Sequence, residues 1–212
     1  MIVFGSSMSP FVRKVLAFAA EKGIEVESRP TGLASTDPEF LAASPFGKIP
    51  ALTDGDFSIS DSTAIVAYLD ALKPEPALIP AEPRARARTM WFDEFADTIL
   101  FATGGTMFFN RIVAPRFLGR DGDLAAADNA EREDLPRLLD YLEGQIPDSG
   151  FLVADRLTLA DIAVASPFAN LGHCGVDLGG RTKLSNYVSA ISARPSFASW
   201  IEREKRFLAR AA

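Results

Sequence analysis

Residues 47–62 read GKIPALTDGDFSISDS, and this stretch decides how the first part of the chain folds. Residues 51–53 and 57–59 are short runs with apolar members, and Asp54-Gly55-Asp56 separates them. An Asp-Gly pair between such runs is a strong signal for a tight turn, so the sequence predicts a β-hairpin. Residues 63–69 follow directly and have the composition of a buried helix. We therefore expect a hairpin that leads into a helix.

The stretch before the hairpin alternates between strand and helix patterns. Ser9 and Pro10 suit the cap and first position of a helix, and Gly23 suits its end. The expected elements are a strand at residues 2–4, a helix at 10–22, a strand at 24–27 and a short helix that Asp37-Pro38 opens. With the hairpin and its helix, the order is β-α-β-α-β-β-α. This order predicts an α/β domain over residues 1–75.

The chain after the hairpin and its helix is expected to be entirely helical. A proline-rich linker at residues 76–83 precedes an all-helical domain at residues 84–212, because prolines interrupt a continuous helix. Thr158 and Asp161 have the spacing of a capping box at a helix start. The expected helices span residues 84–109, 124–145 with a kink or break at Pro136, 158–171, 184–193 and 196–208.

Composition excludes several classes of protein. The 212 residues carry a net charge of −6, which argues against a nucleic-acid-binding protein. His173 and Cys174 are the only residues of their types, so neither a disulfide framework nor a Cys- or His-rich metal site is expected. Their adjacency resembles a nucleophile pair, but a structural role is the better interpretation. No apolar run reaches the length of a membrane span, and the first residues do not resemble a signal peptide, so a reducing, cytoplasmic setting is expected.

Three motifs carry a resemblance to a known family. They are Ser9-Pro10-Phe11-Val12-Arg13-Lys14-Val15, Gly47-Lys48-Ile49-Pro50-Ala51-Leu52 and Ser60-Asp61-Ser62. Their order and spacing are similar to those of the glutathione transferase family. The resemblance implies a thioredoxin-like N-terminal domain and an all-α C-terminal domain. A serine at position 9, rather than tyrosine or cysteine, is similar to the serine-type classes such as tau, theta and zeta, and the class stays open. The resemblance is to a bacterial-like member.

The resemblance also implies a binding site for glutathione as co-substrate. It assigns the sulfur to Ser9, the glycyl carboxylate to Lys48, and the cysteinyl backbone to Ile49 before a cis Pro50. Asp61 and Ser62 would hold the γ-glutamyl end, although aspartate departs from the family's usual glutamate. Helix N-termini at Ser9 and Ser62 would suit a thiolate and a carboxylate.

Simpler readings of these motifs remain open. Ser6 or Ser7 could contact the sulfur instead, and Ser9 could be only a helix cap. Likewise, Ser60 could cap the third helix, with Asp61 as a favourable acid in its first turn.

The second substrate is expected between the domains, as a small hydrophobic electrophile. Met8, Phe11, Phe101 and Phe108 are the residues that we expect in its wall, and the other candidates are Trp91, Met107, Phe109 and Arg111. The resemblance implies glutathione conjugation by a homodimer, with no metal, nucleic acid or membrane involved. An isomerase or dehalogenase that uses the same thiolate, or a non-catalytic binding or regulatory protein, are the alternatives.

Overall fold

A single mixed sheet organises the first part of the computed structural model, which describes residues 1–32 and 35–210. The strands are β1 (Ile2–Phe4), β2 (Glu27–Arg29), β3 (Ala51–Asp54) and β4 (Phe57–Ser60). Their order in the sheet is β2-β1-β3-β4, with β1 and β2 parallel and the other pairs antiparallel. The predicted hairpin is confirmed, because β3 pairs with β4 from Ala51↔Ser60 to Asp54↔Phe57.

The second strand begins three residues later than predicted, at Glu27 instead of Ile24. Ile24 is part of the turn that ends the preceding helix, because its N–H donates to the carbonyl of Ala19. Gly23 makes this ending possible with a φ of +61°, which glycine adopts without steric cost. The strand therefore starts only at Glu27, opposite Ile2.

Helices cover both faces of the sheet. The helices are α1 (Pro10–Glu21), α2 (Pro38–Ala43) and α3 (Ser62–Leu72). Val3 and Leu52 pack with residues of α1 and α3 in the main core. Phe4 and Ala51, the next residues along their strands, pack against Phe40 of α2 in a second cluster. Successive strand residues point to opposite faces, so this alternation creates the three layers.

Helices account for most of the chain after residue 82. They are α4 (Pro83–Glu94), α5 (Phe101–Phe108), α6 (Ala114–Phe117), α7 (Leu124–Asn129), α8 (Leu135–Gln145), α9 (Leu159–His173), α10 (Thr182–Ser192) and α11 (Pro195–Arg210). π-Helical segments join α4 to α5 (Phe95–Leu100), α5 to α6 (Phe109–Val113) and α7 to α8 (Ala130–Asp134). The predicted long helix thus continues eight residues past 109 to Phe117. The third π-helical segment ends just before Pro136, where a kink was expected.

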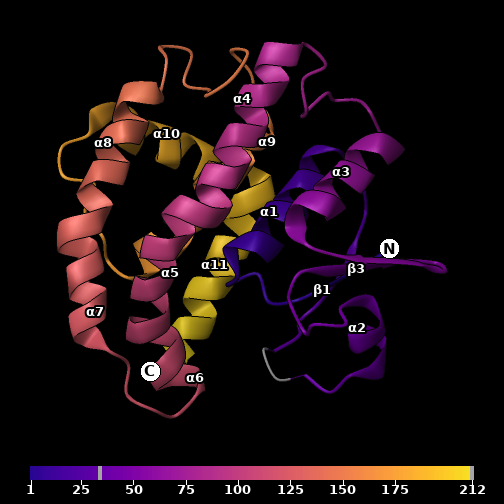
Figure 1. Cartoon of the computed structure of the whole chain (residues 1–212), viewed down its shortest axis with the longest axis horizontal. Coiled ribbons are helices and arrows are strands. Elements are labelled where there is room, and N and C mark those ends of the chain that lie inside the picture. Colours follow the sequence, from indigo (N-terminus) through magenta and orange to yellow (C-terminus); the bar gives the residue numbers. More distant parts are fainter. Residues whose placement is uncertain (33–34, 211–212) are drawn as a thin grey trace.

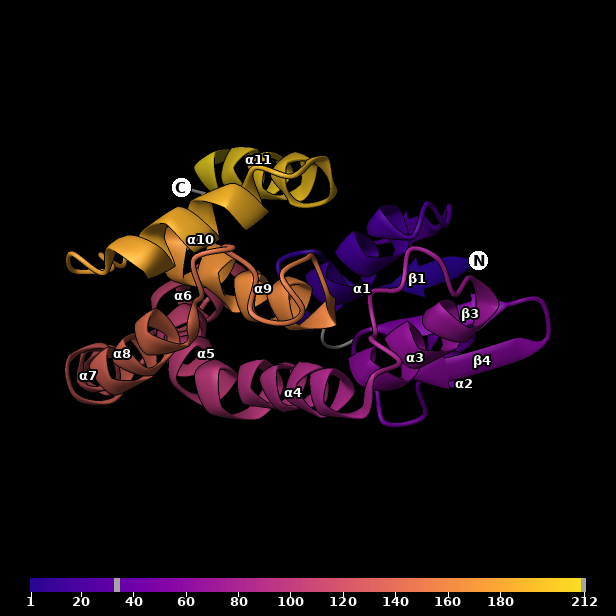
Figure 2. The ribbon, with the colours of Figure 1, turned by 90° about the horizontal axis from the view of Figure 1, so that it is seen from above.

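Helix α9 lies at the centre of the helical part. Its residues from Leu159 to Leu171 are buried, and the predicted capping box of Thr158 and Asp161 is present. Figures 1 and 2 show α1 at the junction of the two parts, beside α3 on one side and α9 on the other. Helix α11 also runs alongside α1. The first helix of the chain is therefore enclosed by helices from the C-terminal part.

The segment between α3 and α4 is fixed by a buried lysine. Lys22 donates to the carbonyls of Pro74 (2.9 Å) and Pro76 (2.8 Å), and it forms an ion pair with Asp70. Residues 33–34 and 211–212 of the expected domains lie outside the described residues. In the described part, no helix has the length and apolarity needed to cross a bilayer.

Candidate functional site

A cavity of about 660 Å³ opens between the N-terminal domain fold and helix α4. The residues that line it are Phe11, Ile49, Pro50, Asp61, Ser62, Thr63, Ala64, Ala67, Glu94, Asp97 and Thr98. Five of the predicted site residues therefore meet here, from three different motifs. Ser9, Lys48 and the other apolar candidates are not part of its lining.

Asp61 caps helix α3 at one side of the cavity. Its Oδ1 atom accepts the backbone N–H groups of Thr63 (2.9 Å) and Ala64 (3.0 Å). The alternative of Ser60 as the cap is wrong, because Asp61 itself is the N-cap residue. Its φ of +85° is unusual for a residue with a side chain, and such conformations often occur at functional sites. The turn presents the first peptide groups of α3 to the cavity.

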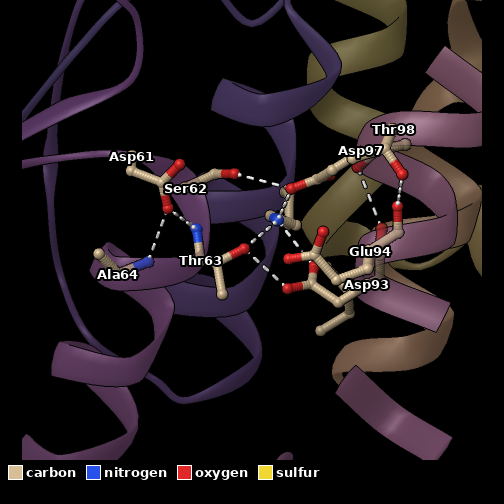
Figure 3. A network of polar contacts seen from close by, with 11 residues as sticks. Asp61, Ser62, Thr63, Ala64, Asp93, Glu94, Asp97 and Thr98 are labelled. Carbon is tan, nitrogen blue, oxygen red and sulfur yellow. Dashed lines mark hydrogen bonds and ion pairs between the residues drawn. The ribbon is translucent and has the colours of Figure 1, made fainter. Parts of the chain in front are cut away.

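Ser62 follows Asp61 and connects the two parts of the chain. It is buried, and its hydroxyl donates to Oδ2 of Asp97 in the segment after α4 at 3.2 Å (Figure 3). Asp97 also lies 2.5 Å from the ammonium of Lys14, which pairs with Asp93 at 2.7 Å. Thr63 donates to Asp93 at 2.8 Å. A buried network of one cation and two carboxylates thus supports the start of α3.

The surroundings of Asp97 act on its carboxyl group in both directions. Burial raises the pKa of Asp97 above its ordinary value, and the neighbouring charge of Asp93 raises it further. The ammonium of Lys14 and the hydroxyl of Ser62 act in the opposite direction, but the net pKa stays raised. With Glu94, Asp97 makes the far wall of the cavity acidic.

The acidic wall, to which Glu94, Asp97 and Thr98 contribute, was not among the site residues expected from the sequence. Thr98 donates to the carbonyl of Glu94 within the same helical run. Asp93 and Asp97 stand four residues apart, so they share one helix face, and this spacing was a usable signal. Their cationic partner, Lys14, is far away in sequence and gave no such signal.

The loop before β3 is arranged as the resemblance implied. The Ile49–Pro50 peptide bond is cis, which confirms that expectation. Ile49 packs closely against Gly5 of the first loop, where a Cβ atom would lie 3.1 Å from the Cβ atom of Ile49. Lys48 is exposed, and its backbone N–H donates to the hydroxyl of Ser44 at 2.9 Å. It precedes the cavity residue Ile49 in the chain.

Ser9 begins helix α1, two residues before the cavity residue Phe11. Its backbone N–H donates to Ser6, and its carbonyl accepts the N–H of Arg13. Among the described residues, its hydroxyl makes no capping hydrogen bond, so the side chain is not committed to the helix. The hydroxyl of Ser6 instead accepts the N–H of Met8 at 3.4 Å. The Ser9 hydroxyl is therefore a candidate donor to a ligand, as is that of Ser6, which only accepts in this contact and keeps its own proton to donate.

The four apolar residues expected in the wall of the second-substrate pocket make contacts near the start of α1. The rings of Phe11 and Phe101 lie 4.5 Å apart between centroids. Met8 packs on the cluster that contains Phe108 and Ile112. The remaining candidates have other partners: Met107 is in the main core, Trp91 donates to Tyr141, Arg120 covers the ring of Phe109, and Arg111 pairs with Asp128 and Glu131.

His173 and Cys174 do not act as a pair. The Nε2 atom of His173 lies 3.0 Å from Oε2 of Glu204. Burial raises the pKa of the Cys174 thiol to about 11, so the thiol stays protonated at neutral pH and is a poor nucleophile. The structural interpretation of these two residues agrees with this geometry.

Comparisons with known proteins identify both parts of the chain. A model of the glutathione S-transferase N-terminal domain matches residues 3–77, and a model of the C-terminal domain matches residues 106–195. Glutathione S-transferase 3 of Zea mays is 31% identical over 92% of this chain and 90% of its own. A glutathione S-transferase of Hyoscyamus muticus is 29% identical over 95% and 98%. A solved structure of glutathione S-transferase I with bound lactoylglutathione superposes with a TM-score of 0.83, at 25% identity, over 95% and 98%.

Proposed function

Because this chain belongs to the glutathione S-transferase family, with glutathione as its co-substrate, we propose that it conjugates the glutathione thiolate to small hydrophobic electrophiles. The observation that carries the proposal is the cavity, where Ile49, Asp61 and Ser62 meet next to the start of α1. These residues come from two separate motifs, and a single ligand of tripeptide length would contact all of them. The related structure with lactoylglutathione binds a ligand of this class.

The γ-glutamyl end of glutathione fits the start of helix α3. Its carboxylate would accept the N–H of Ser62, where the helix dipole places partial positive charge, and also the Ser62 hydroxyl, which would turn from Asp97 to the ligand. Its ammonium would lie toward the carboxylate of Asp61. One oxygen of Asp61 already accepts two backbone N–H groups, so the other is the one left for the ammonium.

The middle and the glycyl end of the tripeptide fit the loop before β3. The N–H and C=O of Ile49, beside the cis Pro50, would pair with the cysteinyl backbone as an added strand does. Lys48 would meet the glycyl carboxylate from the surface. In this orientation the cysteinyl sulfur extends toward the start of α1, where Ser9 lies.

Ser9 would donate its hydroxyl to the sulfur and stabilise the thiolate. A free thiol has a pKa of about 8.5, so it is mostly protonated at neutral pH and needs such a donor. The thiolate then attacks the electrophilic carbon, a C–S bond forms, and the displaced group leaves with the bonding electron pair. Phe11, Phe101, Met8 and Phe108 supply apolar surface for the electrophile beside this point.

The test is the ultraviolet thiolate absorbance of bound glutathione, titrated against pH in the wild type and in Ser9→Ala. We expect the variant to raise the pKa of the bound thiol and to lower turnover at neutral pH, with a smaller change in glutathione affinity. Each unit of pKa corresponds to about 1.4 kcal/mol of differential stabilisation. Superimposable titrations would transfer the role to another donor. A wild type that binds glutathione without any thiolate signal would indicate a non-catalytic binding protein.

We also propose that two copies of the chain form a homodimer, as the family resemblance implied. Phe46 supports this, because its side chain is 88% exposed at the edge of the glutathione loop, where a second copy would cover it. Light scattering of the purified protein measures the state directly.

A further inference from the structure

A second buried polar cluster connects the C-terminal helices to the loop that carries Ser9. Arg13 of α1, Asn170 of α9 and Glu204 of α11 are its central members, and all three are buried. Arg13 is more than 150 residues away in sequence from each of the other two. Polar groups this deeply buried need partners, and Arg13 is the shared partner of Asn170 and Glu204.

Arg13 is the hub of this cluster. Its Nε and Nη2 atoms donate to the two carboxylate oxygens of Glu204, at 3.3 Å and 2.8 Å. This fork geometry fixes the plane of the guanidinium. Its Nη1 atom then donates to the carbonyl of Ser166 and to Oδ1 of Asn170, at 2.5 Å and 2.9 Å. The carboxylate of Glu204 is held in turn by His173 at 3.0 Å.

The orientation of the Asn170 amide follows from the chemistry of Arg13. A guanidinium has donors and no acceptor, so the carbonyl oxygen of Asn170 must face it. The NH₂ group therefore points the other way, and it donates to the carbonyl of Met8 at 2.8 Å. Asn170 thus transmits the fixed position of Arg13 to the loop before α1.

The Met8 carbonyl belongs to the same planar peptide unit as the N–H of Ser9. Asn170 holds the carbonyl side of this unit, and Ser6 accepts the N–H of Ser9 at 2.9 Å on the other side. The next peptide is also held, because the N–H of Arg13 donates to the Ser9 carbonyl at 3.0 Å. Both peptides that flank the Ser9 side chain are therefore fixed.

We propose that Asn170 is a positioning residue for Ser9, through which the C-terminal helices set the direction of the Ser9 hydroxyl. The inference rests on the proposed role of Ser9 toward the glutathione sulfur. Asn170 is not among the described residues that line the cavity, and it reaches Ser9 through the Met8 carbonyl. Its loss lets the peptide between Met8 and Ser9 rotate, and the hydroxyl then spends less time at the sulfur.

The experiment compares wild type, Asn170→Asp and Asn170→Ala. Asn170→Ala removes the donor to Met8 without adding a charge, whereas Asn170→Asp keeps an acceptor for Arg13 but adds a negative charge. We expect the pKa of bound glutathione to rise by about one unit in both variants, which lowers the thiolate fraction and kcat about tenfold at a pH below the wild-type thiol pKa. The KM for glutathione should change less than threefold, because the γ-glutamyl site is untouched. Raising the pH above the new thiol pKa should restore kcat. A shift in Asn170→Asp alone would be an effect of the added charge and would overturn the proposal.

Leu171→Ala is the matched control. Leu171 is the next residue of α9, is equally buried, and packs against Gly104 of α5. This variant should lower the melting temperature and leave the thiol pKa unchanged. An Asn170 variant with a lower melting temperature and the wild-type thiol pKa would overturn the proposal, and so would an equal pKa shift in Leu171→Ala. If Ser9→Ala itself leaves the thiol pKa unchanged, the proposed role of Ser9 fails instead.

Discussion

Removing the ammonium of Lys14 is the most informative test of the network beneath helix α3. Lys14 and Asp93 are both 1% exposed, and Asp97 is mostly buried beside them. Lys14→Met keeps the volume of the side chain and removes the only cation in contact with the two carboxylates among the described residues. Breaking a buried ion pair by removing one partner costs about 3–5 kcal/mol, because the charge that stays behind is uncompensated. We expect a loss of unfolding free energy of that size at pH 8.

The loss should depend on pH in a definite direction. Burial and the charge of Asp93 raise the pKa of Asp97, while Lys14 lowers it. Without Lys14, the pKa of Asp97 rises further. A carboxyl group whose pKa is raised in the folded state stabilises the fold while it is protonated, and this contribution is lost as pH rises through the folded pKa. The difference between wild type and Lys14→Met should therefore shrink from pH 8 to pH 5.

Urea denaturation at the two pH values measures the difference. Lys73→Met is the matched control, because Lys73 is exposed and donates only to the Gly23 carbonyl, so its loss should change the stability by about 0.5 kcal/mol or less. Adding Asp97→Asn to Lys14→Met should recover part of the lost stability at pH 8. A Lys14→Met variant as stable as the control, or equally destabilised at both pH values, would refute the reasoning.

Two further substitutions separate binding from stability. Ser62→Ala should weaken glutathione binding by about 1–3 kcal/mol in calorimetry, because a carboxylate at the start of α3 loses a charge-assisted donor; an unchanged dissociation constant would contradict the assignment of Ser62. Thr158→Ala should lower stability by about 0.5–2 kcal/mol, since it removes half of the α9 capping box. Turnover per folded molecule should stay constant in Thr158→Ala, and its collapse would show that the cap does more than stabilise.

Features with local signals were predictable from the sequence. The Asp54-Gly55 turn, the Ser9-Pro10 helix start and the Thr158–Asp161 cap each depend on residues within four positions of one another, and the structure contains all three. The start of a helix was predictable where the sequence offered a single candidate for the N-cap residue. At the start of α3 two good cap residues are adjacent, and only the positive φ of Asp61 decides between them.

The acidic wall and both buried clusters were not predictable in this way. Arg13 and Lys14 are neighbours in a helix, and a pair of basic residues is usually a solvated surface feature. Neighbouring helix positions point about 100° apart, since the helix has 3.6 residues per turn. One side chain therefore reaches Glu204 of α11, and the other reaches Asp93 of α4. Neither partner can be paired with α1 until the helices are placed in space.

The different directions of these two side chains explain how α1 is held. Arg13 connects it to α9 and α11, and Lys14 connects it to α3 and α4. A helix with charged contacts on two sides cannot turn about its axis without breaking one buried ion pair, which is costly. The start of α1 therefore has a fixed orientation relative to both the cavity beside α3 and α4 and the apolar residues of α5. Ser9 therefore needs no strong hydrogen bond of its own to keep its direction, because the buried Arg13 and Lys14 set the orientation of the helix that it begins.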